Sequence, residues 1–236
     1  MSHPGQGTAQ TPGSPAPSLA WLIERARVPD DAKPLIATAT DGGALVQALA
    51  ANGKAVEALQ VIAAALPPRE GVWWAWVSAR HGSQFAAPDA AAAPAVAAAL
   101  GAVEQWIANP DDERRRAAWA AGERAGLETA AGCAAAAVFF TTGSVAPADV
   151  TPVPPPAGID RMLVGNAVAL AAAAKPDHFE ALVGAYIAQG LEVVKQLGGW
   201  DKAVALSREH FQAQHDRHVR SSMPPSDSSA TPRATH

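Results

Sequence analysis

The stretch that decides the fold spans residues 66–82 and reads Leu66-Pro67-Pro68-Arg69-Glu70-Gly71-Val72-Trp73-Trp74-Ala75-Trp76-Val77-Ser78-Ala79-Arg80-His81-Gly82. It holds three of the seven tryptophans of a 236-residue chain that is otherwise rich in alanine. Alanine favours helix but buries little area, so the large side chains must supply most of the hydrophobic stabilisation. We therefore predict a helix that begins at Pro67-Pro68 and ends at His81-Gly82, with alanine-rich helices packed around it.

The large side chains of this helix divide between two faces. At ~100° per residue, Trp74 lies near Glu70 and His81, and the other face carries Arg69, Trp73, Trp76, Val77 and Arg80. Spacings of four residues allow Arg69 to lie over Trp73 and Arg80 over Trp76, each contact worth roughly 0.5–2 kcal/mol. The rings could form an Arg-flanked groove for a ligand, or they could be the core of the bundle. The core is favoured, because large aromatic residues at helical spacing are usually buried.

The rest of the chain also predicts helices. Apolar residues at helical spacing, together with capping residues and Gly or Pro stops, place them at residues 19–27, 44–51, 54–66, 88–108, 110–125, 130–140, 159–175 and 177–197, with a last one starting at 201. No stretch has the alternating pattern of a strand. We expect one all-α domain over residues 19–217, either a bundle or a short solenoid-like array of helical hairpins, between disordered tails at 1–18 and 218–236.

Residues 143–158 form the clearest internal break, because they contain five prolines, at positions 147, 152, 154, 155 and 156. Such a segment could be a linker between domains or an extended strap across the helices. Its short length, with hydrophobic helices on both sides, favours the strap.

Composition bounds the function. A net charge of −4 gives no reason to expect nucleic-acid binding, and the longest apolar runs fall short of the ~20 residues that a bilayer crossing needs. The opening residues do not resemble a secretory signal, so a cytoplasmic location is expected. The single cysteine, Cys133, excludes an internal disulfide and a cysteine-based zinc site, and we expect no cofactor.

Three other sets of polar residues could indicate an acid/base pair, a phosphate site or a metal site. Glu70 and His81 could be an acid/base pair, but helical rise separates them by about 16 Å. The acids before Arg114-Arg115-Arg116 allow pairs from Asp111 to Arg115 and from Asp112 to Arg116, so we predict a solvated helix face and not a phosphate site. A metal-like cluster of His210, His215 and His218 with Glu209 and Asp216 runs out into the predicted tail, which disfavours a rigid ligand shell.

The chain resembles an uncharacterised bacterial all-helical family, a domain of unknown function with a P-x-R-E-x-x-W-W motif. The resemblance lies in Leu66 to Ala75, and is supported by Trp106, Pro110, Arg115-Arg116-Ala117, Phe140 to Pro147, Val153 to Pro156, Gly190-Leu191 and Trp200. It covers residues 45–200. It implies the domain limits and the all-α fold, and it implies no activity.

We therefore expect a non-enzymatic adaptor or scaffold that binds another protein or itself, with no nucleic acid or membrane as partner. The candidate surface consists of Arg69, Glu70, Trp73, Trp74, Trp76, Arg80 and Tyr186; Tyr186 is included because the helix at 177–197 carries a long apolar stripe. One alternative is a small-ligand binder or enzyme that uses Glu70, Arg69 and Arg80 beside the indoles. Another, by loose analogy with helical chaperones, is an accessory protein of a bacterial secretion apparatus.

Overall fold

The computed structural model describes residues 17–85, 92–147 and 149–222. Within these ranges the chain is all-α, with no strand and eleven α-helices: α1 (Pro17–Ala26), α2 (Lys33–Thr38), α3 (Gly42–Ala51), α4 (Ala55–Ala65), α5 (Pro68–Gly82), α6 (Ala93–Ala108), α7 (Asp112–Ala125), α8 (Ala130–Phe140), α9 (Ile159–Ala173), α10 (Phe179–Gln196) and α11 (Trp200–Ser222). Two 3₁₀ turns lie at Asp30–Ala32 and Pro176–His178. The predicted all-α class is confirmed.

The boundaries of the predicted tails need correction. Pro17 and Ser18 already belong to α1, and α11 continues through residues 218–222 to Ser222. The rest of both predicted tails, residues 1–16 and 223–236, lies outside the described residues, as does the predicted start of the helix at 88–91. The helix predicted at 110–125 begins at Asp112, and Asp111 caps it, since the Asp111 carboxylate accepts from the Arg114 N–H at 2.7 Å.

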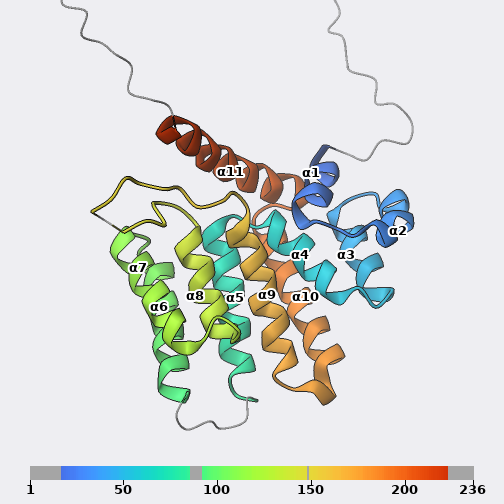
Figure 1. Ribbon diagram of the computed structural model, residues 1–236. Helices are drawn as coiled ribbons and strands as arrows, with labels where there is room; N and C mark the ends of the chain where they lie inside the picture. The colour runs from blue at the N-terminus through green and yellow to red at the C-terminus, as the bar shows by residue number, and fades with distance from the viewer. Residues whose placement is uncertain (1–16, 86–91, 148, 223–236) are drawn as a thin grey trace, which may run out of the picture.

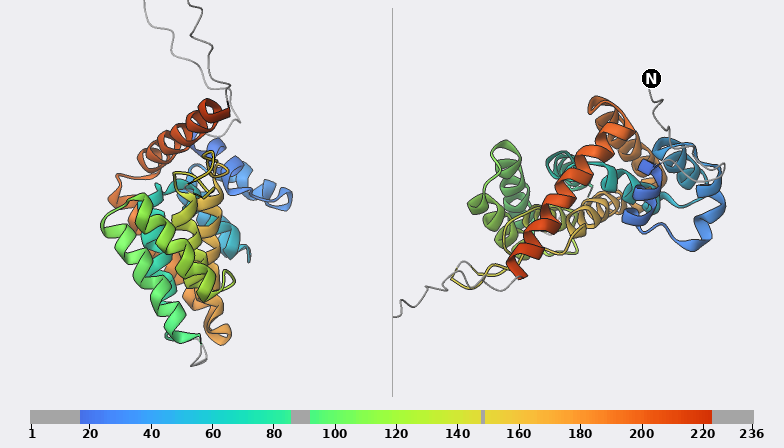
Figure 2. Two further views of the ribbon diagram at one scale, coloured as in Figure 1. Left: turned by 60° about the vertical axis from the view of Figure 1, so that its left-hand side comes forward. Right: turned by 90° about the horizontal axis from the view of Figure 1, so that it is seen from above.

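The helices form a bundle rather than a solenoid. In Figure 1, helices α5 to α10 run side by side, and α11 lies across one end of them; the view from above in Figure 2 shows the same crossing. Helix α9 packs against α8, which precedes it, and also against α4 and α5, which lie far away in the sequence. A solenoid unit contacts only its neighbours along the chain, so these long-range contacts identify a bundle with one core.

Helix α5 lies at the centre because its inner face is shaped for close packing. Its buried residues are Gly71, Val72, Trp74, Ala75, Ser78, Ala79 and Gly82. A Cβ at Gly82 would lie 2.7 Å from the Ala171 carbonyl oxygen, and one at Gly190 of α10 would lie 3.0 Å from the Trp74 ring. Glycine at these two positions therefore lets α9 approach the end of α5 and lets α10 cover the Trp74 indole.

Candidate functional site

The three tryptophans of α5 have three different environments. The Trp74 side chain is fully buried and its indole N–H donates to the Tyr186 carbonyl oxygen at 3.1 Å. Trp76 is half-buried, donates to the Leu100 carbonyl oxygen at 3.0 Å, and has the Arg80 guanidinium 5.3 Å from its ring centre. Trp73 is 37 % exposed. The core interpretation thus holds for Trp74, while Trp73 lies on the surface, and the predicted stack of Arg80 on Trp76 is confirmed.

Arg69 does not stack on Trp73 as predicted. Its Nε donates to the Ile107 carbonyl oxygen at 2.8 Å and its Nη2 to the Ala108 carbonyl oxygen at 3.4 Å. These carbonyls belong to the last turn of α6, where a helix has unpaired acceptors and the negative end of its dipole. Arg69 therefore caps α6 and ties it to α5, a role that the spacing within α5 could not reveal.

A groove opens where α5 begins, next to the end of α6 and the end of α10. Its volume is about 250 Å³, and its lining residues are Arg69, Glu70, Trp73, Ile107, Val193 and Gln196. We call it the Trp73 groove. Of the seven predicted surface residues, Arg69, Glu70 and Trp73 line it, and Arg80 lies on the same exposed face of α5. Val193 and Gln196 were not predicted, because the approach of α10 to the start of α5 has no local sequence signal.

Tyr186 is not a surface residue, and its assignment to the candidate surface is wrong, as is that of Trp74. Only 4 % of Tyr186 is exposed, and its hydroxyl lies 2.9 Å from His81 Nδ1 and 3.4 Å from the Ser78 carbonyl oxygen. Burial raises the pKa of this phenol. The apolar stripe of α10 is real, but α4, α5 and α9 of the same chain cover it. A Tyr186→Asp variant would therefore place a charge in the core.

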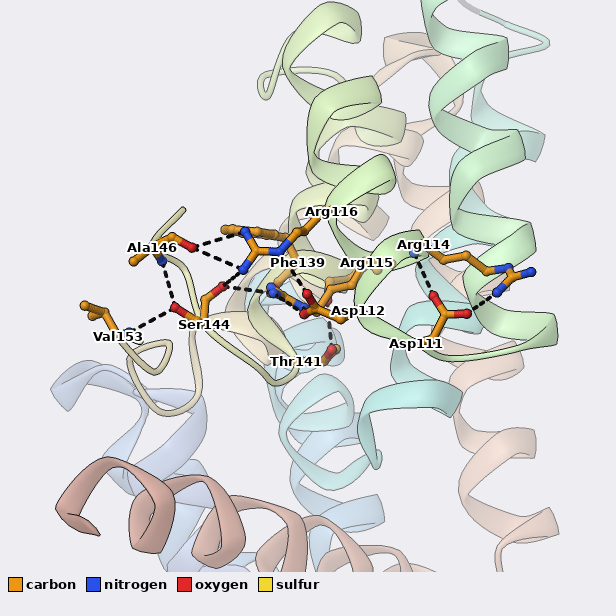
Figure 3. A network of polar contacts seen from close by, with 11 residues as sticks. Asp111, Asp112, Arg114, Arg115, Arg116, Phe139, Thr141, Ser144, Ala146 and Val153 are labelled. Atoms are coloured by element: carbon orange, nitrogen blue, oxygen red, sulfur yellow. Dashed lines mark hydrogen bonds and ion pairs between the residues drawn. The ribbon is translucent and has the colours of Figure 1, made fainter. Parts of the chain in front are cut away.

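Three arginines at the start of α7 form a network around the buried side chain of Arg115 (Figure 3). Arg114 and Arg116 are 39 % and 31 % exposed, so the predicted solvated face is present only in part. The Arg115 side chain has no exposed area; it bonds Asp112 through Nε and Nη2, and donates to the Phe139 carbonyl oxygen at 2.7 Å and the Ser144 carbonyl oxygen at 2.9 Å. The predicted pair of Asp112 with Arg116 is present at 2.9 Å, whereas Asp111 pairs with Arg114 instead of Arg115. Hydrogen bonds from the two arginines lower the pKa of Asp112.

The same network holds the proline-rich segment against the bundle. Arg116 donates to the Ala146 carbonyl oxygen through both terminal nitrogens at 3.1 Å. The Ser144 hydroxyl accepts from the Val153 N–H at 2.9 Å, which closes the loop on itself, as Figure 3 shows. Because α8 and α9 on either side pack against each other, this segment connects two helices of one bundle, as the strap interpretation requires.

A second buried polar cluster joins α9 to α11. Asp160 and Arg161, in the first turn of α9, are 2 % and 5 % exposed, and Arg161 donates to the Ser207 hydroxyl at 3.0 Å and to its carbonyl oxygen at 2.9 Å. His210 Nε2 lies 2.9 Å from the Thr141 carbonyl oxygen. His210 therefore links α11 to the residue that ends α8. Within the ranges that the structure describes, no three His, Cys, Asp or Glu residues form a metal-binding group.

The cluster predicts a pH dependence of stability. Burial holds the pKa of His210 below its ordinary 6.5, so the unfolded chain takes up this proton more readily than the folded protein. The stabilising contribution is fully present above pH 6.5 and is lost as the pH falls toward the lowered pKa. Burial raises the pKa of Asp160, which acts in the opposite direction. We expect the free energy of unfolding to fall less on acidification in His210→Gln than in the unchanged protein.

Urea unfolding at several pH values between 7 and 5 measures this difference. Glutamine retains a donor for the Thr141 carbonyl oxygen. Because the charges of Asp160 and His210 act on each other, the difference between the two proteins reports the imidazole together with its effect on Asp160. Parallel pH profiles would show that His210 takes no part.

The Trp73 groove and the two polar clusters define the class of protein. This is an all-α bundle with polar clusters around the buried arginines Arg115 and Arg161, and three of the seven predicted surface residues line the Trp73 groove. No helix in the described ranges is long and apolar enough to cross a bilayer. The chain belongs to DUF6931, a family of unknown function, whose family model matches residues 45–194. This confirms the resemblance to a domain of unknown function. No curated protein and no solved structure matches the chain.

Proposed function

We propose that the protein acts by binding another protein at the Trp73 groove, as a non-enzymatic adaptor or scaffold. The observation that carries this proposal is the exposure of Trp73, which is 37 %, within a groove with the apolar side chains Ile107 and Val193. Tryptophan is among the residues that most often dominate binding energy at protein interfaces. The Trp73 indole is partly exposed on a helix that is fixed at the centre of the bundle. Its backbone is therefore already ordered before a partner binds, which reduces the entropy cost of binding.

The contents of the groove favour binding over catalysis. A proton-transfer site needs a base or acid together with a second group that can titrate or polarise the substrate. Beside Glu70 the groove offers only Arg69 as a charged side chain, and its guanidinium is held by the carbonyls that end α6 and does not deprotonate in proteins. Arg80, the third residue of the enzyme alternative, contacts Trp76 and does not line this groove.

The motif P-x-R-E-x-x-W-W supports the proposal, because some of its residues stabilise the bundle and others line the groove. Trp74 fills the core, Arg69 caps α6, and Glu70 and Trp73 line the groove. We propose that the family shares this surface, and we carry over from the sequence the expectations that the family is bacterial and that the protein acts in the cytoplasm.

Capture of partners from cells that naturally express the protein tests the proposal. Tagged Trp73→Ala is expected to lose about 30-fold or more of its specific partner, which corresponds to the ~2 kcal/mol of an interface hot spot. Leu206→Ala is a matched control, because Leu206 is also 37 % exposed but lies on α11. Circular dichroism checks that both variants are folded. Equal partner yields from Trp73→Ala and the unchanged protein would reject this site.

A further inference from the structure

The Trp73 groove has two charged side chains, Arg69 and Glu70, and among the residues that the structure describes only Arg69 has a hydrogen-bond partner for its side chain. Among the described residues Glu70 makes no ion pair and no side-chain hydrogen bond, although it is half-buried in the first turn of α5. The other charged group, Arg69, is directed at the carbonyl oxygens of Ile107 and Ala108, at the negative end of the α6 dipole. The interactions of Arg69 are thus satisfied within the bundle, while Glu70 offers a negative charge to an incoming group.

Four aromatic rings in the described residues have a cation over them, and Trp73 is not one of these four. Arg80 lies over Trp76, Arg115 over Phe139 at 4.7 Å and Arg25 over Phe211 at 4.0 Å. Within the described part of the chain, no arginine or lysine lies over Trp73, the most exposed of the three α5 indoles. A cation brought by a partner would find both an unshielded indole and an unpaired carboxylate in one groove.

The other walls and the size of the groove narrow the choice of group. Ile107 and Val193 are apolar and suit a methylene stem, while the Gln196 amide oxygen can accept a hydrogen bond. A volume of about 250 Å³ is below the ~300–1,000 Å³ of sites for drug-sized ligands, so it suits a single side chain. Among basic side chains, arginine has a planar guanidinium that can stack on an indole and bond a carboxylate in bidentate fashion, whereas lysine presents a point charge.

We propose that the Trp73 groove receives an arginine side chain of a partner protein, whose guanidinium pairs with the Glu70 carboxylate and lies against the Trp73 indole. This assignment rests on the proposed function, because it names the chemistry of the partner at the same groove. The stem of the arginine runs between Ile107 and Val193. The contact is strengthened at low ionic strength, since the carboxylate is partly exposed to solvent.

Titration with short blocked peptides, observed by NMR at the indole N–H of Trp73, tests the assignment. The peptide Ac-Ala-Ala-Arg-Ala-Ala-NH₂ is compared with peptides in which citrulline or lysine replaces the arginine. Citrulline has nearly the same shape without the charge, so we expect its affinity to be about tenfold lower or more, because a charge-assisted hydrogen bond to the carboxylate is lost. Glu70→Gln is expected to abolish the preference of the protein for arginine over citrulline.

Four results would overturn the assignment: no saturable shift at Trp73, equal binding of the citrulline peptide, lysine binding as tightly as arginine, or an unchanged preference in Glu70→Gln. These outcomes are separate from the partner-capture test. If Trp73→Ala loses its partner but the arginine peptide does not bind, the proposed function stands and the arginine assignment fails. If the peptide binds but Trp73→Ala retains every partner, the groove recognises arginine in vitro and the proposed function fails.

Discussion

Replacing Arg115 by alanine is expected to lower the free energy of unfolding by about 3–5 kcal/mol, because a buried carbonyl oxygen loses its donor and a buried side chain leaves a void. The cost arises from the loss of hydrogen bonds to backbone carbonyl oxygens more than from the loss of the ion pair with Asp112. The Asp112 side chain is 60 % exposed and keeps its pair with Arg116. The Phe139 carbonyl oxygen loses a donor inside the bundle, which costs about 1–3 kcal/mol. The space of a side chain with no exposed area is also left empty.

The neighbouring Arg114 provides the control for this prediction. It pairs with Asp111 on the same turn of α7, but its side chain is 39 % exposed. Exposed ion pairs contribute about 0.2–1 kcal/mol, so Arg114→Ala is expected to change stability by less than 1 kcal/mol. Denaturant unfolding followed by circular dichroism measures both variants. Similar losses for the two alanine variants would mean that burial of Arg115 is not the source of its contribution.

The arginine network also shows what local sequence reasoning can and cannot predict. Helical spacing correctly paired Asp112 with Arg116, because both partners lie on one helix. It could not show that Arg115 is buried, since its partners Phe139 and Ser144 are 24 and 29 residues further along the chain. The carbonyl groups that accept from Arg115 are backbone atoms, which every residue has, so no residue type marks them in advance.

For the candidate site as well, the sequence predicted positions within one helix but not contacts between helices. The spacing within α5 set Trp74 apart from the face that carries Trp73, about 100° away around the helix, and the structure buries Trp74 and exposes Trp73. It did not show that Arg69 turns toward α6, or that α10 contributes Val193 and Gln196 to the groove. For Tyr186 the apolar stripe correctly indicated a face that is covered, but a stripe does not identify what covers it. Helices of the same chain do so here.

Trp74→Ala is expected to destabilise the protein by about 3–5 kcal/mol, the typical cost of truncating a buried tryptophan. Trp74 is the largest of the fully buried side chains in the described residues. The alanine variant loses the packing of the indole against Gly190 and the hydrogen bond from the indole to the Tyr186 carbonyl oxygen. Collapse of α10 onto the vacated space is limited, because the Ile62 Cγ2 atom already lies close to α10, 2.7 Å from the position of a Cβ on Gly190. The lost volume therefore persists as a cavity, which places the cost near the upper end of the range.

The adjacent tryptophan makes this prediction a matched comparison. Trp73→Ala removes the same side chain from the same turn of α5, but from a position that is 37 % exposed, where the ring has fewer neighbours to lose. We expect its cost to be less than half that of Trp74→Ala, as measured by urea unfolding monitored in the far ultraviolet. Equal costs would place Trp73 in the core, and that result would also remove the physical basis of the Trp73 groove as a binding surface.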